Sequence, residues 1–195
     1  MTNSQVTWPP LTNEMPDLSA LLPSQTLTLV LRLAFPGDRT DAYPARLLHV
    51  TFVRLVDKAT SEYEAARAQM NRYSQEDTPM RPLVALFRAS SEFENCITSL
   101  HRALGLLDSI RRDKNSPKIP DELRATLRAT KNVRQFRGAV QHFDDDLAKG
   151  VPQPGSNMGI RTHSNRIECA CGSIFYSDLA HWIRSLHDYA ARIAA

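Results

Sequence analysis

The chain has 195 residues, of which 42% are hydrophobic and 23% are charged, a length and composition typical of a globular protein with a core of its own. Its formal net charge of +3 permits contact with nucleic acid but is too small to indicate it. Seven glycines are few for this length, which favours helices over a turn-rich all-β fold.

The first 25 residues contain four prolines and many small polar residues, a composition that predicts an extended arm. They lack a basic start followed by an apolar run, so no secretion signal is expected. Nowhere does the chain approach the roughly 18 consecutive apolar residues that a membrane span requires. We therefore expect a cytoplasmic protein without a membrane segment.

A strand is predicted at residues 26–35, TLTLVLRLAF, because leucines alternate there with other residues and PGD follows. Its expected partner is a hairpin near residues 165–176, where β-branched and aromatic residues surround a Gly-Ser turn. On this basis residues 1–44 would form a Pro-rich arm plus a strand, and residues 45–195 a helical domain.

Apolar residues recur at three- and four-residue steps in four later segments, which predicts amphipathic helices. The first two cover residues 44–75 and the stretch from Pro82 to Ile110. A third opens at Pro120 or Asp121 and runs to Leu147, and the last begins at Ser177, which is expected to act as its N-cap. The predicted fold is an all-α, antiparallel four-to-five-helix bundle with a small β addition.

The third predicted helix and its approach are rich in positive charge. Arg124, Arg128 and Lys131 follow one another at four- and three-residue steps and form a ridge that leads towards Arg134. Such a ridge suits a phosphate backbone, although it is also what an ordinary exposed helix face contains. The three aspartates at residues 144–146 more simply solvate the helix surface, and they would repel RNA locally.

The same helix carries Arg137 and, five positions later, His142. On a straight helix these positions diverge by about 140°, so they cannot form a close pair within one helix. They could converge at a frayed helix end, or across the two-fold axis of a dimer. Gln141 is better placed, four residues after Arg137. The simplest alternative is that His142, followed by aspartates, is part of a solvated helix end.

Two long helices followed by a helix with RGAVQHFDDDL resemble HEPN (higher eukaryotes and prokaryotes nucleotide-binding) proteins. That family has a motif of Arg, four to six residues and His, late in the third main helix of a small bundle. The segment FRASSEFENCITSLHRAL is similar to the family's second helix, and the resemblance covers residues 45–194. The sequence departs from the family at Gly138, because the residue after the motif arginine is often polar.

The resemblance implies a metal-independent ribonuclease site at the interface of a homodimer. His142 would transfer protons at a ribose 2′-hydroxyl, and Arg137 would hold the scissile phosphate. Further RNA contacts are expected from Arg134, Gln141, Lys131 and Arg128. RNA and an antitoxin or other protein are the implied partners. The alternative is a non-enzymatic dimerising, interaction or nucleotide-sensing module, since many members of the family act in that way.

The three cysteines, Cys96, Cys169 and Cys171, form no disulfide framework, and reduced thiols are expected. Cys96 is predicted to be a small buried hydrophobe. The sequence CAC differs from the C-x2-C pairs of most zinc sites, so a structural role is favoured over metal binding. His181 and His187 diverge on a helix, and His49 and His101 are expected to be structural. No metal and no cofactor are predicted.

Overall fold

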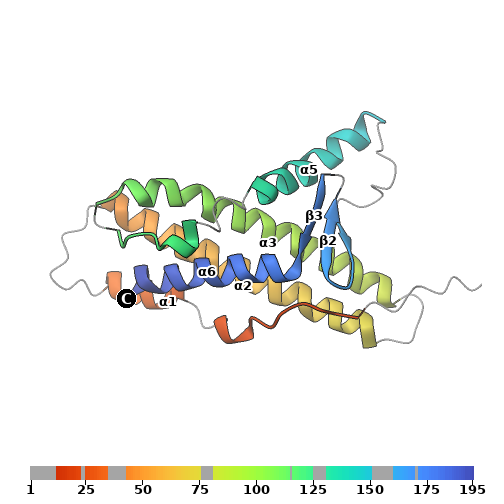
Figure 1. Cartoon of the computed structure of the whole chain (residues 1–195), viewed down its shortest axis with the longest axis horizontal. Coiled ribbons are helices and arrows are strands. Elements are labelled where there is room, and N and C mark those ends of the chain that lie inside the picture. The colour runs from red at the N-terminus through yellow and green to blue at the C-terminus, as the bar shows by residue number, and fades with distance from the viewer. Residues whose placement is uncertain are drawn as a thin grey trace, which may run out of the picture.

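The computed structural model describes residues 12–22, 25–34, 43–75, 81–114, 116–124, 131–150, 160–169 and 171–195. Its elements, in chain order, are η1 (Ser19–Leu21), α1 (Gln25–Ala34), α2 (Tyr43–Gln75), α3 (Arg81–Arg112), α5 (Lys131–Ala148), β1 (Arg161–Thr162), β2 (Arg166–Cys169), β3 (Gly172–Phe175) and α6 (Tyr176–Ala194). A helical bundle with a small antiparallel sheet is the fold predicted from the sequence (Figure 1).

Helices α2 and α3 form a long antiparallel pair, and α6 packs along α2 (Figure 1). The apolar stripe of each helix faces the same core, in which Tyr63 and Phe93 are fully buried. Phe52 of α2 meets Tyr189 of α6 edge to face, with ring centroids 5.8 Å apart. The sequence predictions for these three helices are confirmed, because the three- and four-residue period of their apolar residues is what a helix needs to bury one face.

The small sheet has the order β1-β2-β3 and is antiparallel throughout. Ile167 and Ile174 face each other across β2 and β3 and are buried, so this face of the hairpin covers the core. The prediction of a hairpin near residues 165–176 is confirmed. Helix α6 follows β3 directly, and its N-cap is Phe175 without a side-chain capping bond, so Ser177 is not the N-cap that the sequence predicted.

The predicted strand at residues 26–35 is wrong, because Gln25–Ala34 is the helix α1. Of its alternating leucines whose side chains the structure describes, Leu29 is buried, whereas Leu27 is 62% exposed and Leu31 is 51% exposed. The Asp57 carboxylate of α2 accepts hydrogen bonds from the backbone amides of Gln25 (3.3 Å) and Thr26 (2.7 Å). The first amides of α1 therefore find their acceptor on another helix. The alternation of leucines, from which the strand was predicted, carries no information about such a contact. The hairpin pairs with β1 instead.

The described residues before α1 pack onto the bundle. Leu18 is buried, and its backbone amide donates to the Glu64 carboxylate at 2.6 Å. The Tyr63 hydroxyl donates to the Pro16 carbonyl at 3.1 Å. This part of the predicted arm therefore shares the core of the helices, and the proposed boundary at residue 44 stays a prediction.

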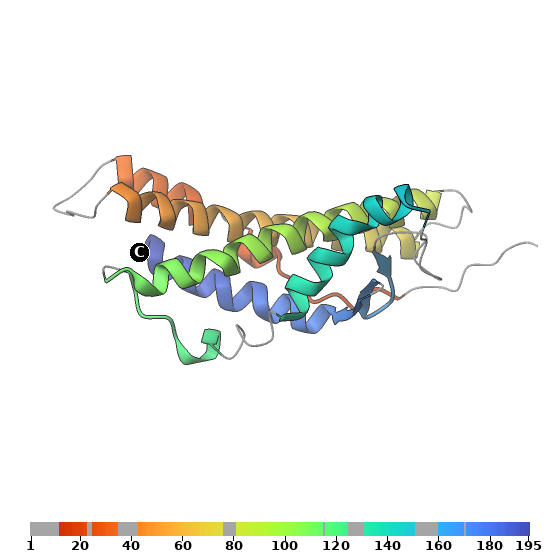
Figure 2. The ribbon, with the colours of Figure 1, turned by 90° about the horizontal axis from the view of Figure 1, so that it is seen from above.

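The predicted third helix is described in two pieces, residues 121–124 and helix α5, with residues 125–130 outside the described part. Figure 2 shows α5 lying across α3, and α5 also contacts strands β2 and β3. No helix among those described combines the length and apolar content that a membrane crossing requires.

Replacing Asp57 with alanine tests the capping of α1 from outside. Loss of the carboxylate leaves two helix-start amides without this acceptor, so we expect unfolding in urea to become easier by about 1 to 2 kcal/mol. Asp108→Ala is the matched control, because Asp108 lies on the surface of α3 and pairs with the exposed Arg111. Its loss should change stability by less than about 0.5 kcal/mol. Equal effects of the two variants would contradict the capping role.

Candidate functional site

One face of helix α5 is buried and the opposite face carries charge. Val133 and Phe136 are buried, and the half-buried Val140 packs against the same core, so this face lies on α3 and the hairpin. Lys131 and Arg134 are exposed. The amphipathic pattern of α5 therefore directs its cations away from the core and along the side of the bundle.

Arg137 lies at the border between these two faces and is half-buried. Its Nε atom is fully shielded from solvent and has no hydrogen-bond partner in the part of the chain that the structure describes. A shielded guanidinium nitrogen without an acceptor is unfavourable, because burial removes the water that would otherwise accept its proton. An anion bound at this position would supply the missing acceptor.

His101 of α3 faces the same cations. Its Nδ1 atom is also shielded and lacks a partner among the described residues. The pKa of His101 is lowered first by burial, and then by the positive charges of Arg137 and Arg134. The fold thus brings together three basic side chains from two helices, His101, Arg134 and Arg137, which we call the basic cluster.

The hydrogen bonding of His101 differs from the sequence prediction. His101 was expected to be a hydrogen-bonded structural histidine, but its Nδ1 has no partner in the described structure. That expectation holds for His49, whose Nε2 lies 2.6 Å from the Ser116 hydroxyl. The sequence gives no signal for His101, because it lies 36 positions before Arg137 and only the packing of α5 on α3 joins them.

The other predicted site residues lie on or near α5 without joining this cluster in the described structure. Gln141 is exposed, and Lys131 is exposed at the start of the helix. His142 has a helical backbone, but its side chain and those of residues 143–147 lie outside the described part, as does Arg128. Because α5 continues to Ala148, positions 137 and 142 sit on a regular helix and diverge by about 140° within one copy.

No group of three or more His, Cys, Asp or Glu side chains suited to a metal ion occurs among the described residues. The two histidines of α6 have different environments, since His181 is exposed and His187 is buried.

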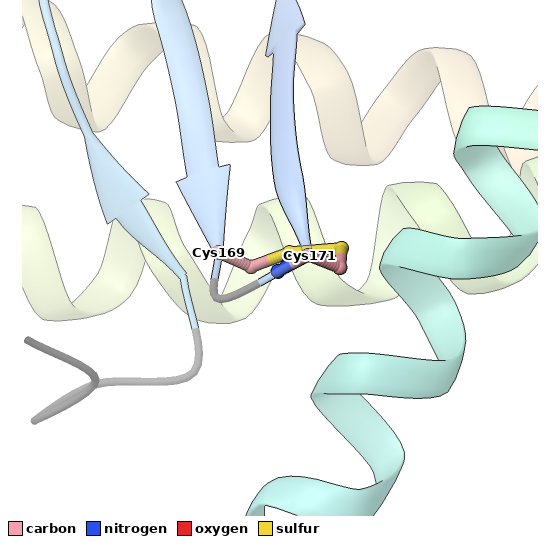
Figure 3. Close-up of a disulfide and its surroundings, with 2 residues drawn as sticks. All are labelled: Cys169 and Cys171. Carbon is pink, nitrogen blue, oxygen red and sulfur yellow. Dashed lines mark hydrogen bonds between the residues drawn. A yellow bond between two sulfur atoms is a disulfide. The ribbon is translucent and has the colours of Figure 1, made fainter. Parts of the chain in front are cut away.

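Cysteine pairing differs from the expectation of reduced thiols. Cys169 and Cys171 form a disulfide at the tip of the β2–β3 hairpin (Figure 3). The sequence prediction found no disulfide framework in the spacing of the cysteines. The turn between β2 and β3 nevertheless brings Cys169 and Cys171 together. Cys96 is free and fully buried, as predicted.

Comparisons with protein-family models, with curated proteins and with solved structures each find no match. The interpretation of the site therefore depends on the residues and on their geometry.

Replacing Arg137 with glutamine should raise the pKa of His101, because it removes the cation with the larger effect of the two that disfavour the imidazolium. The pKa is measured by NMR titration of the labelled imidazole. Arg102→Gln is the matched control: Arg102 is next to His101 in sequence but exposed, and it is not among the causes of the shift. An unchanged pKa in Arg137→Gln would show that the charge of Arg137 does not lower it.

The same shift gives stability a pH dependence of known sign. The folded pKa of His101 lies below the unfolded value of about 6.5, so the unfolded chain takes up the proton first as the pH falls. We expect this contribution to be fully present above pH ~6.5 and to be lost as the pH falls towards the folded pKa. Thermal unfolding of wild type and His101→Gln across this range measures it, and the variant should lose less stability on acidification.

Proposed function

We propose that this protein binds RNA through its phosphate groups, with the basic cluster as the central contact. The observation that carries the proposal is a pair of shielded nitrogens, Arg137 Nε and His101 Nδ1, which lack a partner among the described residues and lie beside the exposed cation of Arg134. An oxyanion offers an acceptor to Arg137 Nε, and to His101 Nδ1 in the states in which that nitrogen carries a proton, and it neutralises the excess charge. A planar guanidinium matches the oxygens of a phosphate in a two-pronged contact.

The exposed residues of α5 extend this contact along a strand of nucleic acid. Lys131 and Arg134 lie on the solvent side of the helix, and Gln141 lies two turns beyond Arg134. Cations spaced along one helix suit successive phosphates of a backbone, and an amide side chain can donate to a sugar or base. Arg128 would continue the same row.

An anion at the cluster also changes the proton balance of His101. Arg137 and Arg134 lower its pKa in the free protein, and a bound phosphate would oppose them. Binding and protonation are then linked, so RNA should bind more tightly as the pH falls through the range in which His101 titrates.

RNA cleavage of the HEPN type is the enzymatic form of the proposal. In that form Arg137 holds the scissile phosphate and His142 transfers protons at the 2′-hydroxyl, without a metal ion. Since positions 137 and 142 diverge within one helix, the two groups would meet only where two copies associate. This form therefore requires a homodimer, and an antitoxin or another protein would act on its shared cleft.

The alternative is a non-enzymatic module that binds RNA or nucleotides, or serves as a dimerising surface. One observation favours it over cleavage: Gly138 lacks the polar side chain that often follows the motif arginine.

Removing single cations tests phosphate binding. Arg137→Ala and Arg134→Ala should each weaken binding of a fluorescent single-stranded RNA, measured by anisotropy, and lower the salt slope by about 0.7 per lost phosphate contact. Arg192→Ala, an exposed arginine near the far end of α6, is the control and should bind as wild type does. Equal losses in all three variants would point to non-specific attraction and contradict a defined site.

Cleavage is tested by incubating the purified protein with total RNA in EDTA. In the enzymatic form, His142→Ala abolishes cleavage and leaves RNA affinity nearly unchanged, because proton transfer and phosphate binding reside on different side chains. His181→Ala, an exposed histidine of α6, is the matched control. Binding without any cleavage by wild type favours the module, and cleavage at wild-type rate in His142→Ala contradicts the assigned role.

A further inference from the structure

The disulfide at the hairpin tip is unusual in how little chain it closes. Cys169 ends β2 and Cys171 directly precedes β3, and their Cα atoms are 5.4 Å apart, within the usual range of about 4.4–6.8 Å (Figure 3). Cys171 is exposed, and Cys169 is half-buried and packs against the core. Cys171 is therefore the more exposed residue of the pair, and Cys169 is the one that contacts the core.

This disulfide contributes little to the stability of the hairpin. Loop-closure stabilisation grows with the length of chain that a disulfide encloses, so a bond between residues two apart gains the least. The turn is already fixed by the ladder, in which Cys169 pairs with Gly172. Gly172 adopts φ +137°, a conformation that residues with a Cβ rarely take, so the backbone itself specifies the reversal.

The two sulfurs have different chemistry. The backbone amide of Cys171 donates to Cys169 Sγ at 3.4 Å. A donor at this position stabilises negative charge on Cys169 Sγ once the bond opens, which makes Cys169 the better leaving group. The exposed Cys171 Sγ is the sulfur that an incoming thiolate can reach.

A shallow hollow of about 360 Å³ lies on the hairpin beside this bond and is lined by Arg166, Glu168, Cys169, Gly172, Ser173 and Phe175. Phe175 is 45% exposed there and offers an apolar contact, while Arg166 and Glu168 supply one charge of each sign. Apolar and charged groups next to a reachable sulfur suit a short peptide that carries a cysteine.

We propose that Cys169 and Cys171 form a thiol–disulfide exchange site whose substrates are cysteine-containing peptide thiols. A substrate thiolate attacks Cys171 Sγ and forms a mixed disulfide, while the bond between the two protein sulfurs breaks and its electron pair leaves on Cys169, which takes a proton from water. A second substrate thiolate then attacks the substrate sulfur, which releases a substrate disulfide and the Cys171 thiolate. Two thiols are oxidised, and the protein disulfide is reduced by two electrons.

A small-molecule disulfide such as glutathione disulfide closes the cycle by running the same two exchanges in reverse. The proposal is independent of RNA binding, since the basic cluster contains no sulfur. RNA affinity of the cysteine variants should therefore equal that of wild type, which separates failure of one proposal from failure of the other.

The test uses the full chain with a single-cysteine peptide and glutathione disulfide, and follows peptide disulfide by chromatography. Wild type should accelerate its formation above the protein-free rate, and Cys169→Ser and Cys171→Ser should each lose the acceleration. Cys96→Ala is the matched control and should retain it, because Cys96 is a free thiol buried in the core. Circular dichroism should show wild-type folding in both serine variants, since the ladder holds the hairpin.

The order of attack has its own readout. With glutathione disulfide alone, mass spectrometry should detect a mixed disulfide on Cys171 in Cys169→Ser, and one forming at least about tenfold more slowly on Cys169 in Cys171→Ser, because access limits exchange. Faster capture on Cys169 would overturn the proposal. So would a peptide oxidation rate equal to the protein-free rate, or a protein disulfide that stays closed in excess reduced glutathione.

Discussion

The structure depends on the mutual burial of the apolar stripes of α2 and α3, which α6 completes along α2. Tyr176 couples the small sheet to this core: its ring stacks on Phe93 with centroids 5.4 Å apart, and its hydroxyl donates to the His163 carbonyl at 2.9 Å. Because the hairpin is fixed at this end of the bundle, α5 has a surface made of α3 and the sheet on which to pack. Both proposed sites lie on elements positioned in this way.

Some shielded polar groups of the described structure have hydrogen-bond partners and others have none. In the core, the Glu62 carboxylate pairs with Lys58 and accepts the Ser99 hydroxyl at 2.8 Å, so its burial is compensated. Between α3 and α5, the shielded nitrogens of His101 and Arg137 have no such compensation within the described structure. Burying a polar atom without a hydrogen bond costs free energy, and a bound ligand that supplies the missing acceptor removes that cost. The basic cluster is therefore a candidate binding site.

Helix α5 carries two residues of the basic cluster and contacts the disulfide hairpin, but the two proposed sites use different chemistry. Phosphate recognition needs fixed cations and shielded donors, which helices α3 and α5 provide through their packing. Thiol exchange needs a reachable sulfur and a stabilised leaving group, which a tight turn provides through its backbone amide. The two proposed activities can therefore be tested separately by variants that leave the core unchanged.

The sequence by itself determined the helices of the core and the hairpin, because burying one face of a helix or strand imposes a period that can be counted. It also singled out the cations of α5. Only the tertiary structure decided that residues 25–34 are helical, since the Asp57 carboxylate that accepts hydrogen bonds from their first two backbone amides belongs to another helix. It alone placed His101 beside Arg137 and closed Cys169 onto Cys171, because both contacts depend on packing and turn geometry that residue spacing does not encode.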